Sequence, residues 1–304
     1  MIRPPPLAPG DIVRVIAPAG PFDAGRFERG LAVLRDRLGL RPRFREDIVA
    51  RQRYLAGPDP RRAAEWQEAV ADEAASAIFC ARGGYGSMRI LPAIDPRPLL
   101  ARPKLFMGFS DVTAIHAWLN KAGLCTVHGP GVAQLALLPD EPLVHLRALL
   151  FGEPFATRSD ALPAPGAGLA GAETIRPGRA TGPLVGGNLT LLSHLAGTPY
   201  LPSLDGAILF IEDVGEPPYR LDRCLTQLKL AGLLDRIAGV AVGQLSRCDD
   251  VEADILGLDV VREAVRDLGV PALEGLPAGH EDANFALPLG ARVTLVAPGP
   301  GEDG

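Results

Sequence analysis

A serine stands at the corner of the segment MGFSDVTAIH, where an apolar run gives way to a helical pattern. Ser110 follows KLFMGF (104–109), which is typical of a buried strand, and precedes VTAIHAWLNKAG (112–123), an amphipathic helix. A hydroxyl held at such a turn can act as a nucleophile, because the N–H groups at the helix start point the same way. The match to a Gly-x-Ser-x-Gly elbow is incomplete, since Val112 replaces the last glycine. Serine is also a favoured helix cap, so the segment alone leaves both roles open.

A serine nucleophile needs a histidine as its base. Of the five histidines, His280 lies in GLPAGHEDANFALPLG (275–290), a segment bracketed by glycine and proline that predicts a loop able to reach a cleft. His128 closes a short strand pattern in TVHGP and is a weaker candidate. The remaining histidines lie in helical patterns and are expected to be structural: His116, His145 and His194.

The base in turn needs a carboxylate to orient it. Five apolar residues lead into Glu212 in AILFIEDVGEPPYRLDR, so this acid sits where a buried strand ends. Asp213 is better suited to capping the turn. A structural alternative remains, in which Glu212 pairs with Arg220 or Arg223.

Strand and helix patterns alternate through the first half of the chain, which predicts a parallel sheet covered by helices. We expect an α/β protein with an N-terminal parallel-sheet domain (1–155), a linker (156–180) and a smaller mixed α/β domain (181–304). The linker follows from a Pro/Gly/Ala-rich stretch without periodicity. The expected strands are 11–17, 77–81, 104–109 and 125–130 in the first domain, and 206–212, 237–245 and 291–297 in the second.

Composition restricts the possible partners and the location. A net charge of −5 and a pI near 5.6 argue against nucleic acid and give no support to binding an anionic membrane. Neither a signal peptide nor an 18-residue apolar run is readable, so we expect a cytoplasmic protein. The four cysteines are widely spaced, which argues against a disulfide framework or a zinc site. Cys80 and Cys125 lie in apolar contexts, which favours buried reduced thiols. No metal or other cofactor is expected.

Six motifs occur together and in order: ARGGYGSMRILPAID, MGFSDVTAIH, TVHGP, GGNLTLL, IEDVGEPPYRLDR and GHEDAN. In this combination the chain resembles the LD-carboxypeptidase family of serine peptidases, over nearly its whole length. The resemblance implies a catalytic triad of Ser110, Glu212 and His280. Together with the cap preference of serine, it leads us to expect that Ser110 both caps its helix and attacks the substrate. It also implies a small peptide substrate, the cytosolic murein tetrapeptide, from which a terminal D-Ala is removed during cell-wall recycling. A homodimer is expected on the same ground.

Within that reading, the oxyanion would lie against the backbone N–H groups of Asp111 and Gly84. Arg82 is the nearest candidate for binding the terminal carboxylate. The RGGYG loop (82–86) has phosphate binding as a rival reading, although it lacks the P-loop pattern. Two other functions stay open: hydrolysis of aminoacyl-nucleotides, as in the related microcin C immunity proteins, and non-catalytic binding of a small molecule.

Overall fold

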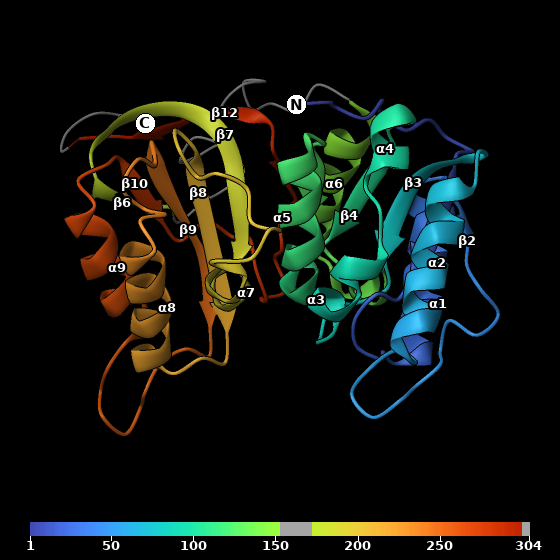
Figure 1. The fold of residues 1–304 in the computed structure, drawn as a ribbon, viewed down its shortest axis with the longest axis horizontal. Coiled ribbons are helices and arrows are strands. Elements are labelled where there is room, and N and C mark those ends of the chain that lie inside the picture. The colour runs from blue at the N-terminus through green and yellow to red at the C-terminus, as the bar shows by residue number, and fades with distance from the viewer. Residues whose placement is uncertain (153–171, 300–304) are drawn as a thin grey trace. The chain divides into compact units, whose positions relative to one another are not determined.

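Two six-stranded sheets organise the chain (Figure 1). The structure is a computed structural model and describes residues 1–152 and 172–299. Among these residues, 1–152 together with 285–288 form one unit, and 172–284 together with 289–299 form the other. Each unit contains a sheet with helices, so the α/β fold class is confirmed.

The first sheet has the order β11-β5-β4-β3-β1-β2. The pairs β1–β2, β1–β3, β3–β4 and β4–β5 are all parallel. The order 2-1-3-4-5 reverses direction between β1 and β3, and ligands of doubly wound sheets bind in the crevice at that switch point. The strands are β1 (Ile12–Ile16), β2 (Arg41–Arg43), β3 (Ala75–Cys80), β4 (Leu105–Gly108), β5 (Thr126–His128) and β11 (Leu287–Leu289).

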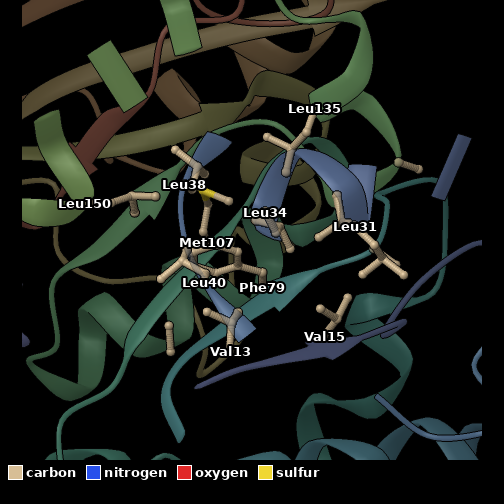
Figure 2. Close-up of a cluster of buried hydrophobic side chains, with 14 of the residues drawn as sticks. Val13, Val15, Leu31, Leu34, Leu38, Leu40, Phe79, Met107, Leu135 and Leu150 are labelled. Carbon is tan, nitrogen blue, oxygen red and sulfur yellow. The ribbon is translucent and has the colours of Figure 1, made fainter. Parts of the chain in front are cut away.

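Alternating side chains on these strands build a core on both faces of the sheet. Phe79 and Met107 point to one face, into a cluster that includes Leu31 of α1 (Figure 2). Phe106 points to the other face, where its ring lies 5.5 Å from that of Trp66 on α2. The helices are α1 (Ala24–Ala32), which continues as a π-helical turn η1 (Val33–Arg37), α2 (Asp59–Ala71), α3 (Ser87–Ile90), α4 (Arg97–Ala101), α5 (Thr113–Ala122) and α6 (Asp140–Phe151), with 3-10 turns η2 (Leu91–Ala93), η3 (Ser110–Val112) and η4 (Val132–Leu137).

The second sheet has the order β12-β7-β8-β9-β10-β6 and is mixed. Its four central strands run parallel, whereas the edge strands β12 and β6 pair antiparallel. Its elements are β6 (Glu173–Arg176), β7 (Gly178–Asn188), β8 (Ile208–Val214), β9 (Gly239–Ser246), β10 (Ala272–Glu274), β12 (Arg292–Ala297), α7 (Leu189–Leu195), α8 (Pro218–Leu230) and α9 (Gly257–Asp267).

Two segments differ from the expected domain plan. Residues 173–180 of the predicted linker form β6 and the start of β7, because they pair with β10 and β12 from far along the chain; residues 156–171 lie outside the described residues. The predicted loop 275–290 ends in β11, which belongs to the first sheet. The second domain is therefore interrupted at 285–288. No helix within the described ranges is long and apolar enough to cross a membrane.

Candidate active site

Ser110 lies at the carboxyl end of β4, an inner strand of the first sheet. Phe109 is fully extended, and Ser110 then turns into the left-handed region with φ of +62° before the 3-10 turn η3. A non-glycine residue held there costs about 1–3 kcal/mol and is most frequent at functional sites. The predicted capping role of Ser110 is wrong, because no side-chain cap bond forms and a cap residue prefers extended dihedrals.

The glycine loop after β3 approaches this corner closely. A Cβ added to Gly83 would lie 2.9 Å from Ser110 Cβ and 3.2 Å from Ser110 Oγ, so only glycine fits there without displacement. Gly20, from the loop after β1, donates its N–H to the Gly83 carbonyl at 3.0 Å. Gly84, the predicted oxyanion residue, has φ of +108° and packs toward Gly20. The loops that follow β1, β3 and β4 thus meet around the serine.

Asp111 and His116 support the corner from inside the unit. The Asp111 carboxylate accepts the Ser87 N–H at 2.7 Å, and burial raises its pKa. The Asp111 side chain therefore ties α3 to the turn at Ser110. The oxyanion role predicted for Asp111 concerns its backbone N–H and not this side chain. The His116 Nε2 atom lies 2.8 Å from the Gly108 carbonyl oxygen, and burial lowers the pKa of His116 to about 4. A neutral His116 ring thus braces the last residue of β4.

A buried arginine that the sequence reasoning missed holds two of these loops together. Arg62 on α2 is completely buried and donates to the carbonyl of Gly86 at 2.8 Å and to that of Pro18. One turn along, the buried Glu65 accepts the Ala17 N–H at 2.8 Å. Helix α2 thereby fixes the loops after β1 and β3.

Glu212 and His280 meet in the second unit. His280 Nδ1 lies 2.7 Å from Glu212 Oε2, and Glu212 is completely buried whereas the His280 side chain is 14% exposed. Burial raises the pKa of Glu212, and the hydrogen bond from His280 partly opposes this shift. An ionised Glu212 accepts only, so Nδ1 then carries the proton and Nε2 is the basic nitrogen.

Strand β8 is irregular at Glu212. The pairing of β8 with β9 shifts register between Ile211 and Asp213, which places a bulge at the acid. The alternative pairing of Glu212 with an arginine is wrong. Arg220 instead pairs with Glu216 at 3.3 Å, and Arg223 lies over the ring of Tyr219.

Gln244, near the end of β9, holds the histidine loop, and no pattern in the sequence pointed to it. Its Nε2 donates to the Ala283 carbonyl at 2.9 Å, and its Oε1 accepts the Glu281 N–H at 2.8 Å. Gly279 donates its N–H to Asn284 Oδ1 at 3.1 Å. These bonds bracket His280 on both sides.

The other histidines have structural surroundings. His128, the weaker candidate base, is completely buried with its ring 5.8 Å from that of Phe109. His145 is buried beside the carbonyl of Ala286 at 2.8 Å. His194 is exposed on α7.

Arg82 lines a cavity of about 650 Å³ at the switch point of the first sheet. Its Nη1 donates to the Pro21 carbonyl at 2.6 Å, which orients the guanidinium. Arg26 and Arg51 line the same cavity, together with Asp23. The arginine proposed from sequence therefore belongs to a cationic cavity.

Comparison with known proteins gives matches to two family models. The LD-carboxypeptidase N-terminal domain matches residues 13–129, and the LD-carboxypeptidase C-terminal domain matches residues 181–295. The chain belongs to the LD-carboxypeptidase family. The first matched range contains Ser110, and the second contains Glu212 and His280.

Relatives of this LD-carboxypeptidase family member include proteins named murein peptide carboxypeptidases and proteins named MccF. The chain is 38% identical to a Bacillus subtilis protein named "Probable murein peptide carboxypeptidase" (96% of this chain, 91% of the relative) and 32% identical to the murein tetrapeptide carboxypeptidase of Pseudomonas aeruginosa (93% and 92%). The crystal structure of muramoyltetrapeptide carboxypeptidase from Oxalobacter formigenes superposes with a TM-score of 0.80 at 28% identity (94% and 95%). The structure of MccF in complex with glutamyl sulfamoyl guanosine superposes with a TM-score of 0.84 at 25% identity (95% and 94%).

No candidate metal site is present among the residues that the structure describes. Over residues 1–152 and 172–299, no group of three or more His, Cys, Asp and Glu side chains could hold an ion. All four cysteines are free and buried, and burial was expected for Cys80 and Cys125.

Proposed function

We propose that this protein is a serine-type LD-carboxypeptidase that removes the terminal D-Ala of murein tetrapeptides. The observation that carries the proposal is the 2.7 Å bond between His280 and the buried carboxylate of Glu212. A histidine oriented in this way can act as a general base for a nucleophilic hydroxyl group. Ser110, with its left-handed backbone at the end of β4, is the nucleophile we assign to it.

The reaction follows from these assignments. Ser110 Oγ attacks the carbonyl carbon of the residue before D-Ala, and His280 Nε2 takes the hydroxyl proton. The backbone N–H groups of Asp111 and Gly84 stabilise the oxyanion, and each donor contributes about 10²–10³ in rate. His280 then protonates the leaving amine, D-Ala departs, and water hydrolyses the acyl-enzyme by the same route. Glu212 holds the imidazole and stabilises its charged form.

Arg82 binds the terminal carboxylate in this proposal. Its guanidinium is already oriented by Pro21, and Gly83, the next residue, touches Ser110. A carboxypeptidase substrate places its terminal carboxylate a few bonds from the scissile carbonyl, so a cation close to the serine suits that group. We further propose that the enzyme works in the cytoplasm, in cell-wall recycling, and as a homodimer.

A second candidate is hydrolysis of aminoacyl-nucleotides, favoured by the similarity to MccF. The murein reading is preferred because relatives named murein carboxypeptidases reach higher identity. Trp66 is buried on α2 and Trp118 lies within α5, so neither supplies an aromatic loop for a nucleobase. A non-catalytic binding protein would have no need of the buried Glu212–His280 pair.

Mass spectrometry tests the proposal directly. The purified protein is incubated with L-Ala-γ-D-Glu-meso-diaminopimelate-D-Ala, beside the Ser110→Ala variant. We expect loss of one D-Ala with the wild type only. Equal cleavage by both proteins would remove Ser110 from the mechanism. A folded wild type that cuts no peptide would shift the assignment to aminoacyl sulfamoyl nucleotides, which are the next substrates to assay.

A further inference from the structure

The cavity lined by Arg82 carries more positive charge than one terminal carboxylate requires. Its charged lining consists of Arg26, Arg51, Arg82 and Asp23, which leaves a net charge of +2. A volume of about 650 Å³ is typical of a ligand site and exceeds what one small terminal residue fills. The cavity lies where the loops after β1 and β3 meet, which is where this sheet order places ligands.

The three arginines have no carboxylate partner of their own in the structure. Across the described ranges, 1–152 and 172–299, no carboxylate oxygen lies within 4.0 Å of their guanidinium nitrogens. Asp23, the one acid of the lining, accepts the backbone N–H of Arg26 at 2.7 Å and so caps α1. Uncompensated guanidinium groups around a cavity favour an anionic ligand with planar oxygens.

Arg51 directly precedes a tight turn, and its Nε donates to the Arg53 carbonyl of that turn at 3.3 Å. Gln52 and Leu55 exchange both backbone hydrogen bonds, and Arg53 between them has φ of +57°. The next residue, Ala56, donates its N–H to Ala19 at 2.9 Å, which ties this turn to the loop after β1. A strained and anchored turn that presents a cation to a cavity is typical of a binding element.

We propose that the arginine-lined cavity binds a second carboxylate of the substrate peptide, with Arg51 as its principal cation. The inference rests on the proposed function and extends it, because Arg82, whose neighbour Gly83 lies against Ser110, takes the terminal carboxylate. The two carboxylates together balance the net charge of the lining. In the murein tetrapeptide the second carboxylate belongs either to the γ-linked D-Glu or to diaminopimelate, and the chemistry of recognition is the same for both. Arg51 then selects peptides in which this group is ionised.

Calorimetry with three peptides tests the inference. The Ser110→Ala variant is titrated with the parent tetrapeptide, with the D-isoglutamine form, and with the form that has L-Lys in place of diaminopimelate. We expect one charge-deleted peptide to bind about ten- to hundred-fold more weakly than the parent, which corresponds to one charge-assisted contact. Its identity names the carboxylate.

Variants of the arginine then locate the contact. Adding Arg51→Gln should abolish the preference, whereas adding Arg102→Gln should retain it. Arg102 has the same charge but precedes β4 and so lies at the amino end of that strand, opposite the carboxyl ends where the cavity lies. There it pairs with Glu73 at 2.5 Å. Equal affinity for all three peptides, no binding of any, or a preference that survives Arg51→Gln would overturn the inference. AMP that binds more tightly than the parent peptide and depends on Arg51 would also overturn it.

Cleavage by the wild type is recorded separately with the same peptides. A protein that shows the Arg51-dependent preference without cleavage retains the second-carboxylate site and loses the proposed function. A protein that cleaves all three peptides with equal kcat/KM retains the proposed function and loses this inference.

Discussion

Replacing Glu212 by Gln should make the protein more stable and nearly inactive. The acid is completely buried and its folded-state pKa is raised by that burial, although His280 donates to it. An acid with a raised folded-state pKa contributes its full stability below its unfolded pKa of about 4.3, and this contribution is lost as the pH rises through the folded-state value. Glutamine has nearly the same shape and no charge to desolvate.

The expected rate loss follows from the tautomer of His280. Glutamine can donate its amide N–H to Nδ1, which leaves the proton on Nε2, where the base is needed. We expect kcat to fall by about 10³–10⁴, which is about 4–5.5 kcal/mol of transition-state stabilisation. KM should change little, because Glu212 touches no substrate in the proposed mechanism.

Urea unfolding from pH 4 to 8, together with kcat for the tetrapeptide, measures both effects. Glu212→Gln should have a higher free energy of unfolding than the wild type. This difference should be smallest near pH 4 and should rise with pH. Asp111 and Glu65, whose pKa values are also raised by burial, are present in both proteins and cancel. Glu216→Gln, which removes a half-buried acid paired with Arg220, is the control and should leave kcat unchanged. An unchanged kcat in Glu212→Gln would contradict the orienting role of Glu212, and a stability difference that falls with pH would contradict its raised pKa.

Three further substitutions test how the site is held. Gly83→Ala should lower kcat by about 10² and the free energy of unfolding by about 1–3 kcal/mol, because the added Cβ would lie 2.9 Å from Ser110 Cβ. The control is Gly25→Ala on α1, whose added Cβ would have no contact under 3.3 Å, and it should retain activity in the same assays. Gln244→Ala should lower kcat at least tenfold with little shift in the urea midpoint, because it releases the two bonds to the histidine loop, and an unchanged kcat would contradict this role. Arg62→Met should lower the free energy of unfolding by about 3 kcal/mol, measured with urea, because buried carbonyls and a carboxylate lose their donor; a loss below 1 kcal/mol would argue against it.

The sequence predicted the elements whose pattern is local. The apolar runs that became β3, β4 and β8 are confirmed, because a strand buried on both faces reads as a continuous hydrophobic segment. The polar loops that follow such strands in the first sheet meet at one edge, so the proximity of the glycine loop to Ser110 follows from topology.

Features set by distant partners were not predictable. The left-handed backbone of Ser110 lies closely against Gly83, which is 27 residues earlier in the chain. β11 has three residues and depends on its place beside β5, so its pattern is too short to recognise. Gln244 and Arg51 are single polar residues whose roles appear only once their loops are folded.

Active-site labelling tests whether His280 activates Ser110. A fluorophosphonate is reacted with the wild type, with His280→Ala and with His194→Ala, which removes an exposed histidine of the same unit. The modified residue is located by peptide mass. We expect rapid labelling of Ser110 in the wild type and in His194→Ala, and labelling slowed by at least about 10³ in His280→Ala. Labelling of another residue, or of Ser110 at an equal rate in all three proteins, would contradict it.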